Sequence, residues 1–265
     1  MRYSYRGGWG GPSYRAYGGY GGWGLTPMVK KLILVNAAIF LGLAVLGGFS
    51  RPLVAGLVGL LGVVPRDVVF GLRLWQPLTY LFLHLGFWHL FFNMFALWMF
   101  GSPLERDWGS RRFLRYYLLT GVGAGILNVV VTLLWGGRAA IVPTIGASGA
   151  IYGILLAFGL LYPHQPIFLW FLFPIPARIF VLIFGAIAFV SALGGPGSGV
   201  SHVSHLGGML FGYLYLRGGW RGLYRGALDR YVDWRMKQSR RKFDVSMHEQ
   251  DEDEREIPRH DRWIH

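Results

Sequence analysis

The sequence predicts an all-α polytopic membrane protein whose helices form a six-helix transmembrane bundle. Of its 265 residues 53% are hydrophobic and only 15% are charged, a composition that excludes an ordinary soluble globular domain. The charged residues lie mostly near the two ends of the chain. The stretches between them that contain no charge are 32–50, 74–104, 116–137, 139–177 and 179–216. Because about 20 apolar residues span the hydrocarbon of a bilayer, each stretch is long enough to cross it.

The two longest stretches contain prolines, which interrupt helices. The breaks fall at Tyr162-Pro163-His164-Gln165-Pro166 and at Pro174-Ile175-Pro176, so that the last two stretches together hold three crossings. The six helices are therefore expected at 29–48, 77–101, 113–134, 148–162, 177–193 and 201–216.

The basic residues orient the bundle. With the N-terminus in the cytoplasm, only four of the 26 Lys and Arg residues lie on the outer side, namely Arg51, Arg66, Arg73 and Arg138. Because basic residues are enriched in cytoplasmic loops, both termini are expected in the cytoplasm. The apolar stretch 52–65 between the first two helices is too short to cross the bilayer and is expected in its outer interface.

Three regions follow from composition. Residues 1–27 form a Gly-, Tyr- and Arg-rich cytoplasmic tail that is expected to be disordered, and residues 28–217 hold the helices. Residues 218–265 begin as a basic amphipathic helix, whose charged face would suit anionic lipids of the inner leaflet, and end in an acidic tail. The net charge of +13 needs no nucleic-acid partner, and none is expected. The absence of cysteine excludes disulfides and thiol nucleophiles.

Strongly polar side chains at membrane depth are costly and usually serve a function. The second helix carries His84, His89 and Asn93, of which the last two are four residues apart and share one face. Both could donate hydrogen bonds to one point. The fourth helix starts at Gly146-Ala147-Ser148-Gly149, with Tyr152 one turn further on. The free amides and positive dipole end of a helix N-terminus favour an oxyanion beside Ser148.

The sixth helix brings a histidine towards this serine. Gly208 and Gly212 share the face of His205, and Gly149 and Gly153 form a matching pair on the fourth helix. Small residues four apart let membrane helices approach closely, which would set His205 beside Ser148. A neutral imidazole within hydrogen-bond reach of a serine hydroxyl can generate a nucleophile. The charge-free stretches contain no Asp or Glu, so the pair would be a dyad with His205 oriented by packing, with Tyr152 a candidate.

Three ordered motifs resemble those of the rhomboid family of intramembrane serine proteases over about residues 30–217. They are His89-Leu90-Phe91-Phe92-Asn93, Gly146-Ala147-Ser148-Gly149, and the run from His205 to Gly212, in which Gly208 and Gly212 follow the histidine at three and seven residues. The resemblance implies that Ser148 is the nucleophile and His205 the general base. It also implies that His89, Asn93 and the Ser148 backbone N–H stabilise the oxyanion, that Tyr152 packs on His205, and that His202 is only a neighbour.

The resemblance implies hydrolysis of a peptide bond in or near a transmembrane segment of another membrane protein, without a cofactor or metal. The expected substrates unwind easily near their outer end and are cut after a small residue, with Gly or Pro nearby. Six helices without a seventh fit a multi-pass protein of a prokaryotic cytoplasmic membrane. Glu105 and Gly109 fit the family pattern and look structural, whereas Gln76 stands where the family usually has arginine. The sequence does not indicate an oligomeric state.

Two alternatives stay open at this point. One is a catalytically inactive rhomboid-like protein of the Derlin or pseudoprotease type, which binds membrane clients without cutting them, although such proteins lack the serine or the histidine. The other is a metal transporter or membrane metalloenzyme, since imidazole is a common zinc ligand. Its ligands would be His84, His89, His202 and His205.

Overall fold

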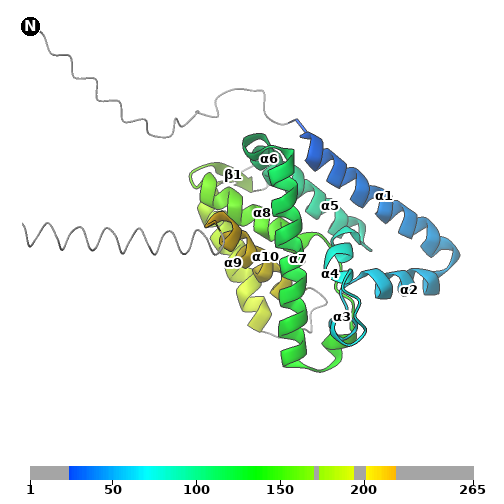
Figure 1. Cartoon of the computed structure of the whole chain (residues 1–265). Coiled ribbons are helices and arrows are strands. Elements are labelled where there is room, and N and C mark those ends of the chain that lie inside the picture. The colour runs from blue at the N-terminus through cyan, green and yellow to red at the C-terminus, as the bar shows by residue number, and fades with distance from the viewer. Residues whose placement is uncertain (1–23, 170–172, 194–200, 219–265) are drawn as a thin grey trace, which may run out of the picture.

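The computed structural model describes residues 24–169, 173–193 and 201–218 (Figure 1). The predicted disordered tail lies almost wholly outside the described residues, as do the predicted basic helix and acidic tail after residue 218. The described residues form a mostly helical bundle. Its α-helices are α1 (Pro27–Phe49), α2 (Arg51–Leu61), α3 (Pro65–Val69), α4 (Gln76–Thr79), α5 (Phe87–Ala96), α6 (Ser102–Trp108), α7 (Ser110–Trp135), α8 (Ser148–Leu161), α9 (Ala177–Leu193) and α10 (His202–Leu216).

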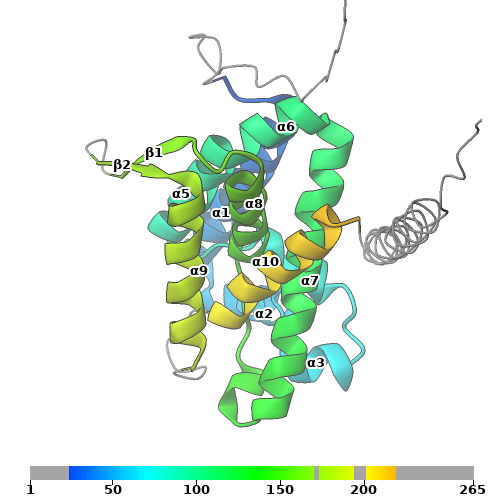
Figure 2. The same ribbon diagram turned by 90° about the vertical axis from the view of Figure 1, so that its left-hand side faces the viewer.

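Helices α7, α8 and α10 form the centre of the bundle, with α10 crossing beside both of the others (Figure 2). Four of the predicted helices match α1, α7, α8 and α10 to within three residues at each end, and 177–193 matches α9. Among the described residues, α1 and α7 are each long and apolar enough to cross a membrane, and the bent pair 76–82 and 87–108 could form a third span. Because α8 and α9 are shorter, the count of six crossings stays a prediction.

The predicted second helix, 77–101, is wrong as a single helix. The chain forms α4 and a 3₁₀ turn (Tyr80–Phe82), runs extended to Gly86, and only then begins α5, at an angle of 97° to the first part. In a continuous helix the Tyr80 carbonyl would bond to the amide four residues later. Here it accepts the amides of Leu83, at 3.2 Å, and of Gly146, at 2.9 Å. The helix breaks here because the Gly146 amide satisfies the Tyr80 carbonyl and because Gly86 has a low helix propensity.

Helix α5 continues through a π-helical turn (Leu97–Gly101) into α6, and a short 3₁₀ turn (Arg138–Ile141) follows α7. The proline-rich break between α8 and α9 is a β-hairpin, in which β1 (Pro166–Leu169) pairs antiparallel with β2 (Phe173–Pro176). Proline patterning predicts the interruption of the helix but does not predict this pairing.

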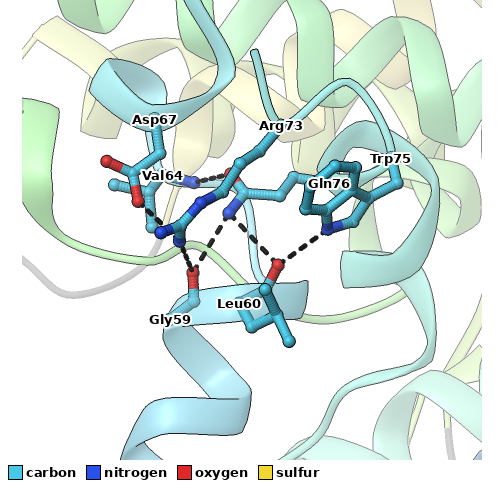
Figure 3. Close-up of polar contacts among 7 residues, drawn as sticks. All are labelled: Gly59, Leu60, Val64, Asp67, Arg73, Trp75 and Gln76. Carbon is cyan, nitrogen blue, oxygen red and sulfur yellow. Dashed lines mark hydrogen bonds and ion pairs between the residues drawn. The ribbon is translucent and has the colours of Figure 1, made fainter. Parts of the chain in front are cut away.

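The connection between α1 and α5 is held by side chains that bind the C-terminal carbonyls of α2 (Figure 3). The buried Gln76 carboxamide donates to the carbonyls of Gly59, at 3.0 Å, and Leu60, at 3.3 Å, and accepts the Val64 amide at 2.9 Å. Arg73 also donates to the Gly59 carbonyl, at 3.1 Å, and Arg73 pairs with Asp67 at 2.8 Å. Gln76 therefore fastens this loop by hydrogen bonds to both ends of its amide.

Glu105 ties α6 to the N-terminus of α1. This carboxylate is 3% exposed and accepts the backbone amides of Met28, at 2.8 Å, and Val29, at 2.9 Å, and the hydroxyls of Thr26 and Ser110. A carboxylate at a helix N-terminus satisfies amides that have no partner within the helix and interacts favourably with the helix dipole. The structural role expected of Glu105 is thus given a physical basis.

We expect Glu105→Ala to lower the free energy of unfolding by about 3 kcal/mol, since it leaves buried donors without an acceptor. Thermal unfolding in detergent, followed by tryptophan fluorescence, would show a lower midpoint. Asp107→Asn, a change at an exposed carboxylate on the same helix, is the control: the amide keeps an oxygen that can accept the Tyr162 hydroxyl, so the variant should stay within about 0.5 kcal/mol of the wild type. Equal midpoints for the two variants would contradict the role given to Glu105.

Candidate active site

Ser148 is the first residue of α8 and follows a turn that only glycine can make easily. Gly146 has φ +114°, and a Cβ atom there would lie 2.6 Å from the His89 ring. The N-cap residue of α8 is Ala147, which has no side-chain acceptor to cap the first amides of the helix. The half-buried Ser148 hydroxyl therefore stands at the uncapped, positive end of a helix dipole.

His205 comes from the first turn of α10, and its Nε2 atom lies 2.9 Å from the Ser148 Oγ atom. Its ring is stacked on that of Tyr152, with centroids 4.1 Å apart and planes 5° apart. Within the described part of the chain, His205 Nδ1 has no hydrogen-bond partner. The structure thus brings together the three residues that the sequence suggested for nucleophile, base and packing partner, and the ring of His205 is held by stacking.

Close backbone contact between α8 and α10 makes this pairing possible. A Cβ atom on Gly208 would lie 1.8 Å from the Gly149 carbonyl oxygen, and one on Gly153 would lie 3.0 Å from the Gly208 carbonyl oxygen. A Cβ atom on Gly212 would lie 2.5 Å from the Tyr116 hydroxyl and 3.4 Å from Gly153 Cα. The two glycine pairs therefore meet as their spacing indicated.

The proposed oxyanion residues lie on α5, which begins after Gly86. The His89 ring packs against Gly146 at the nucleophile turn. The Asn93 side chain is buried, and its Nδ2 atom donates to the His89 carbonyl at 2.7 Å. His89 is thus placed against the turn that carries Ser148, and Asn93 lies one turn behind it.

His84 is a site residue whose position sequence reasoning missed. It lies in the extended connection before α5, fully buried, with its ring edge-to-face with that of His89 at 4.9 Å. Its Nε2 atom faces the Ala147 amide at 3.4 Å. The sequence singles out His84 as a polar residue in an apolar segment, and Gly86, between the two histidines, is the signal for the break that sets its position. His202 remains a neighbour, with its ring edge-to-face with that of His205 at 5.7 Å.

No group of three His, Asp or Glu side chains in residues 24–169, 173–193 and 201–218 comes together in a way that could hold a metal ion. His84 approaches the edge of His89, and His202 approaches the edge of His205, as two separate pairs of rings. The four-histidine metal site that the sequence left open gains no support from this arrangement.

Comparison with known proteins adds an independent line of evidence. The Rhomboid domain family matches residues 71–221. Rhomboid protein 1, mitochondrial, of Saccharomyces cerevisiae is 38% identical over 141 residues, which are 52% of this chain and 39% of the yeast protein. Rhomboid protease GluP of Bacillus subtilis is 37% identical over 140 residues, which are 53% of this chain and 25% of that protein. Putative rhomboid protease YdcA of Bacillus subtilis is 32% identical over 161 residues, 57% of this chain and 74% of that protein.

The match covers less than half the length of the yeast protein and a quarter of GluP. It therefore concerns the shared membrane domain. The relatives include mitochondrial and bacterial proteins, so they do not select the prokaryotic location expected from the sequence.

Proposed function

Since the chain belongs to the rhomboid family, we propose that it is an intramembrane serine endopeptidase that hydrolyses peptide bonds in or near transmembrane segments of other membrane proteins. The observation that carries the proposal is the 2.9 Å approach of His205 Nε2 to Ser148 Oγ at the N-terminus of a helix. A nucleophile, a base within hydrogen-bond reach and a source of oxyanion donors are the parts that acyl transfer requires.

In the proposed reaction His205 accepts the Ser148 proton while Ser148 Oγ attacks the scissile carbonyl carbon. The negative charge that develops on the carbonyl oxygen is stabilised by the Ser148 amide, His89 and Asn93. His205 then returns the proton to the leaving amine, and the C–N bond breaks. A water molecule, deprotonated by His205, hydrolyses the acyl-enzyme and regenerates Ser148. Stacking on Tyr152 takes the place of a carboxylate in orienting the imidazole.

The proposed substrates are transmembrane segments that unwind near their outer end, because a regular helix protects its backbone from attack. Cleavage after a small residue, with Gly or Pro nearby, is proposed from family membership. We also propose that both termini lie in the cytoplasm, so that substrates reach the site from the outer side of the membrane. Contact of the basic segment after residue 218 with anionic lipids is proposed on composition alone.

The test is covalent labelling of the full-length purified protein with a fluorophosphonate probe, followed by mass spectrometry of the labelled peptide. We expect one modification, at Ser148, and cleavage of a model membrane substrate with a Gly-containing segment. A substrate with a Leu-rich stable helix should be cut more slowly, and equal cleavage of the two would contradict the proposed preference. Absence of both labelling and cleavage from folded protein would favour the inactive, client-binding alternative.

A further inference from the structure

The two halves of the proposed dyad come from chain segments far apart in sequence, and both segments contact one side chain of α7. Asn128 is 4% exposed. Its Oδ1 atom accepts the Ser201 hydroxyl at 2.6 Å, and its Nδ2 atom donates to Thr144 Oγ1 at 3.2 Å. A weaker contact, at 3.4 Å, comes from the Thr132 hydroxyl on the same helix. One carboxamide thus bridges the loop that leads to Ser148 and the start of the helix that carries His205.

The Ser201 arm fixes the first turn of α10. Ser201 is the N-cap of that helix: its hydroxyl oxygen accepts the Ser204 amide at 3.2 Å, and its carbonyl accepts the His205 amide at 3.4 Å. Because the hydroxyl has a single proton and gives it to Asn128, the 2.9 Å contact between the Ser201 and Ser204 hydroxyls takes its proton from Ser204. The turn that positions His205 is therefore attached to α7 through Asn128.

The Thr144 arm fixes the loop before α8. Thr144 lies four residues before Ser148 and forms an isolated antiparallel bridge with Val63, with bonds of 2.8 Å and 2.9 Å between their backbone atoms. The next residue, Val64, is held by Gln76. The Thr144 hydroxyl is therefore a hydrogen-bond partner whose backbone is held in place. A displacement of Asn128 or of Val63 would move Thr144 and, through it, the turn that carries Ser148.

An asparagine at position 128 is energetically unfavourable unless its side chain is hydrogen-bonded. It is a poor helix former, and a buried amide in a membrane helix needs partners on other segments to offset its desolvation. Its two arms are used in opposite senses, as acceptor and as donor, so an apolar residue of the same size could not hold both segments. A packing role alone does not require this chemistry.

We propose that Asn128 is a positioning residue that sets the separation of Ser148 and His205 by clamping the Thr144 loop to the N-cap of α10. The inference rests on the proposed function. With Asn128→Ala the Ser201 and Thr144 hydroxyls lose their common partner, and α10 can shift against the nucleophile turn. Because a misplacement of about 1 Å costs about 10²-fold in rate, we expect a fall of about 10- to 100-fold.

The experiment measures the rate constant of fluorophosphonate labelling at saturating probe separately from the final labelled fraction. Loss of fold lowers the labelled fraction, whereas misalignment lowers the rate constant of each folded molecule. Asn128→Ala is expected to lower the rate constant and to leave the labelled fraction near that of the wild type. Asn36→Ala removes another fully buried asparagine, on α1, and is expected to leave the rate constant unchanged.

Substitutions at Thr144 and at Ser201 test the two hydrogen bonds of Asn128 separately. Thr144→Val keeps the shape of the side chain and removes the hydroxyl, so it should be slower than Thr144→Ser, which keeps the hydroxyl. Ser201→Ala should slow labelling, partly because it also removes the N-cap of α10. Combined with Asn128→Ala it should slow labelling by less than the product of the two single losses, since both changes break the contact between Ser201 and Asn128. A wild-type rate constant for Asn128→Ala, or a fall confined to its labelled fraction, would overturn the proposal.

A spectroscopic measurement keeps this test independent of catalysis. In protein with ¹⁵N-labelled histidine, the ring signals of His205, assigned with His205→Ala, are expected to shift in Asn128→Ala and to stay in place in Asn36→Ala. If wild-type Ser148 is not labelled, the proposed function fails and the ¹⁵N signals alone decide the clamp. Unchanged His205 signals in Asn128→Ala would then refute it.

Discussion

Replacement of Ser148 by alanine is expected to lower peptide hydrolysis by at least about 10⁴-fold, and replacement of His205 by alanine to lower it by a similar factor. Without the hydroxyl no acyl-enzyme forms. Without the imidazole, 2.9 Å away in the wild type, the serine keeps its proton and is a weak nucleophile. Each variant should be measured with the same model membrane substrate, and His205→Ala also with the fluorophosphonate probe.

The double variant distinguishes a dyad from two independent contributions. Residues that act as a unit have non-additive effects, so Ser148→Ala with His205→Ala should be no slower than either single variant. His202→Ala is the matched control, because its ring meets only the edge of His205 and is not expected to take part in proton transfer. A 10⁴-fold loss in His202→Ala, or multiplying losses in the double variant, would contradict the assignment of His205 as sole base.

The helices that the sequence predicts well are those whose ends coincide with the ends of a continuous apolar run. Helix α9 begins directly after Pro176 and ends at Leu193, where the sequence continues as Gly194-Gly195-Pro196, so a continuous apolar run between helix-breaking residues reproduces its bounds. The segment 77–101 is equally apolar but breaks near Gly86. Its conformation is decided by the bond between the Tyr80 carbonyl and the Gly146 amide, which joins residues far apart in sequence. Apolar patterning carries no information about such a partner.

The candidate site divides in the same way. The approach of Ser148 and His205 can be predicted from the sequence, because glycines four residues apart on each helix indicate that the two helices pack closely. His84 and Asn128 are polar residues whose partners lie on loops, and nothing local to either indicates which loop it meets. Gln76 is a similar case: its amide meets carbonyls at the end of α2, a contact that only the folded loop reveals.

A methyl group at Gly208 is expected to cost at least about 10²-fold in the labelling rate constant of Ser148. The added Cβ would lie 1.8 Å from the Gly149 carbonyl oxygen, far inside van der Waals contact. The backbone of α10 fixes the position of the Cβ atom, and the oxygen belongs to the backbone of α8, so no side-chain rotation relieves the clash and α8 and α10 must separate. Ser148 precedes Gly149, and His205 lies one turn before Gly208. The separation is therefore transmitted to the 2.9 Å contact of the dyad, where about 1 Å costs about 10²-fold.

The neighbours of the added methyl group, and not the loss of a glycine, should decide the size of the effect. Gly185→Ala on α9 also faces α10, but its Cβ would meet the flexible end of Met209 at 3.2 Å, which can move aside. Gly42→Ala on α1 has nothing within 4 Å and tests helix propensity alone. We expect the rate constants to fall in the order Gly42→Ala, Gly185→Ala, Gly208→Ala, with the last also lowering the unfolding midpoint through about 1–3 kcal/mol of overpacking. If Gly208→Ala reacted as fast as Gly42→Ala, backbone contact between α8 and α10 could not be what sets the dyad.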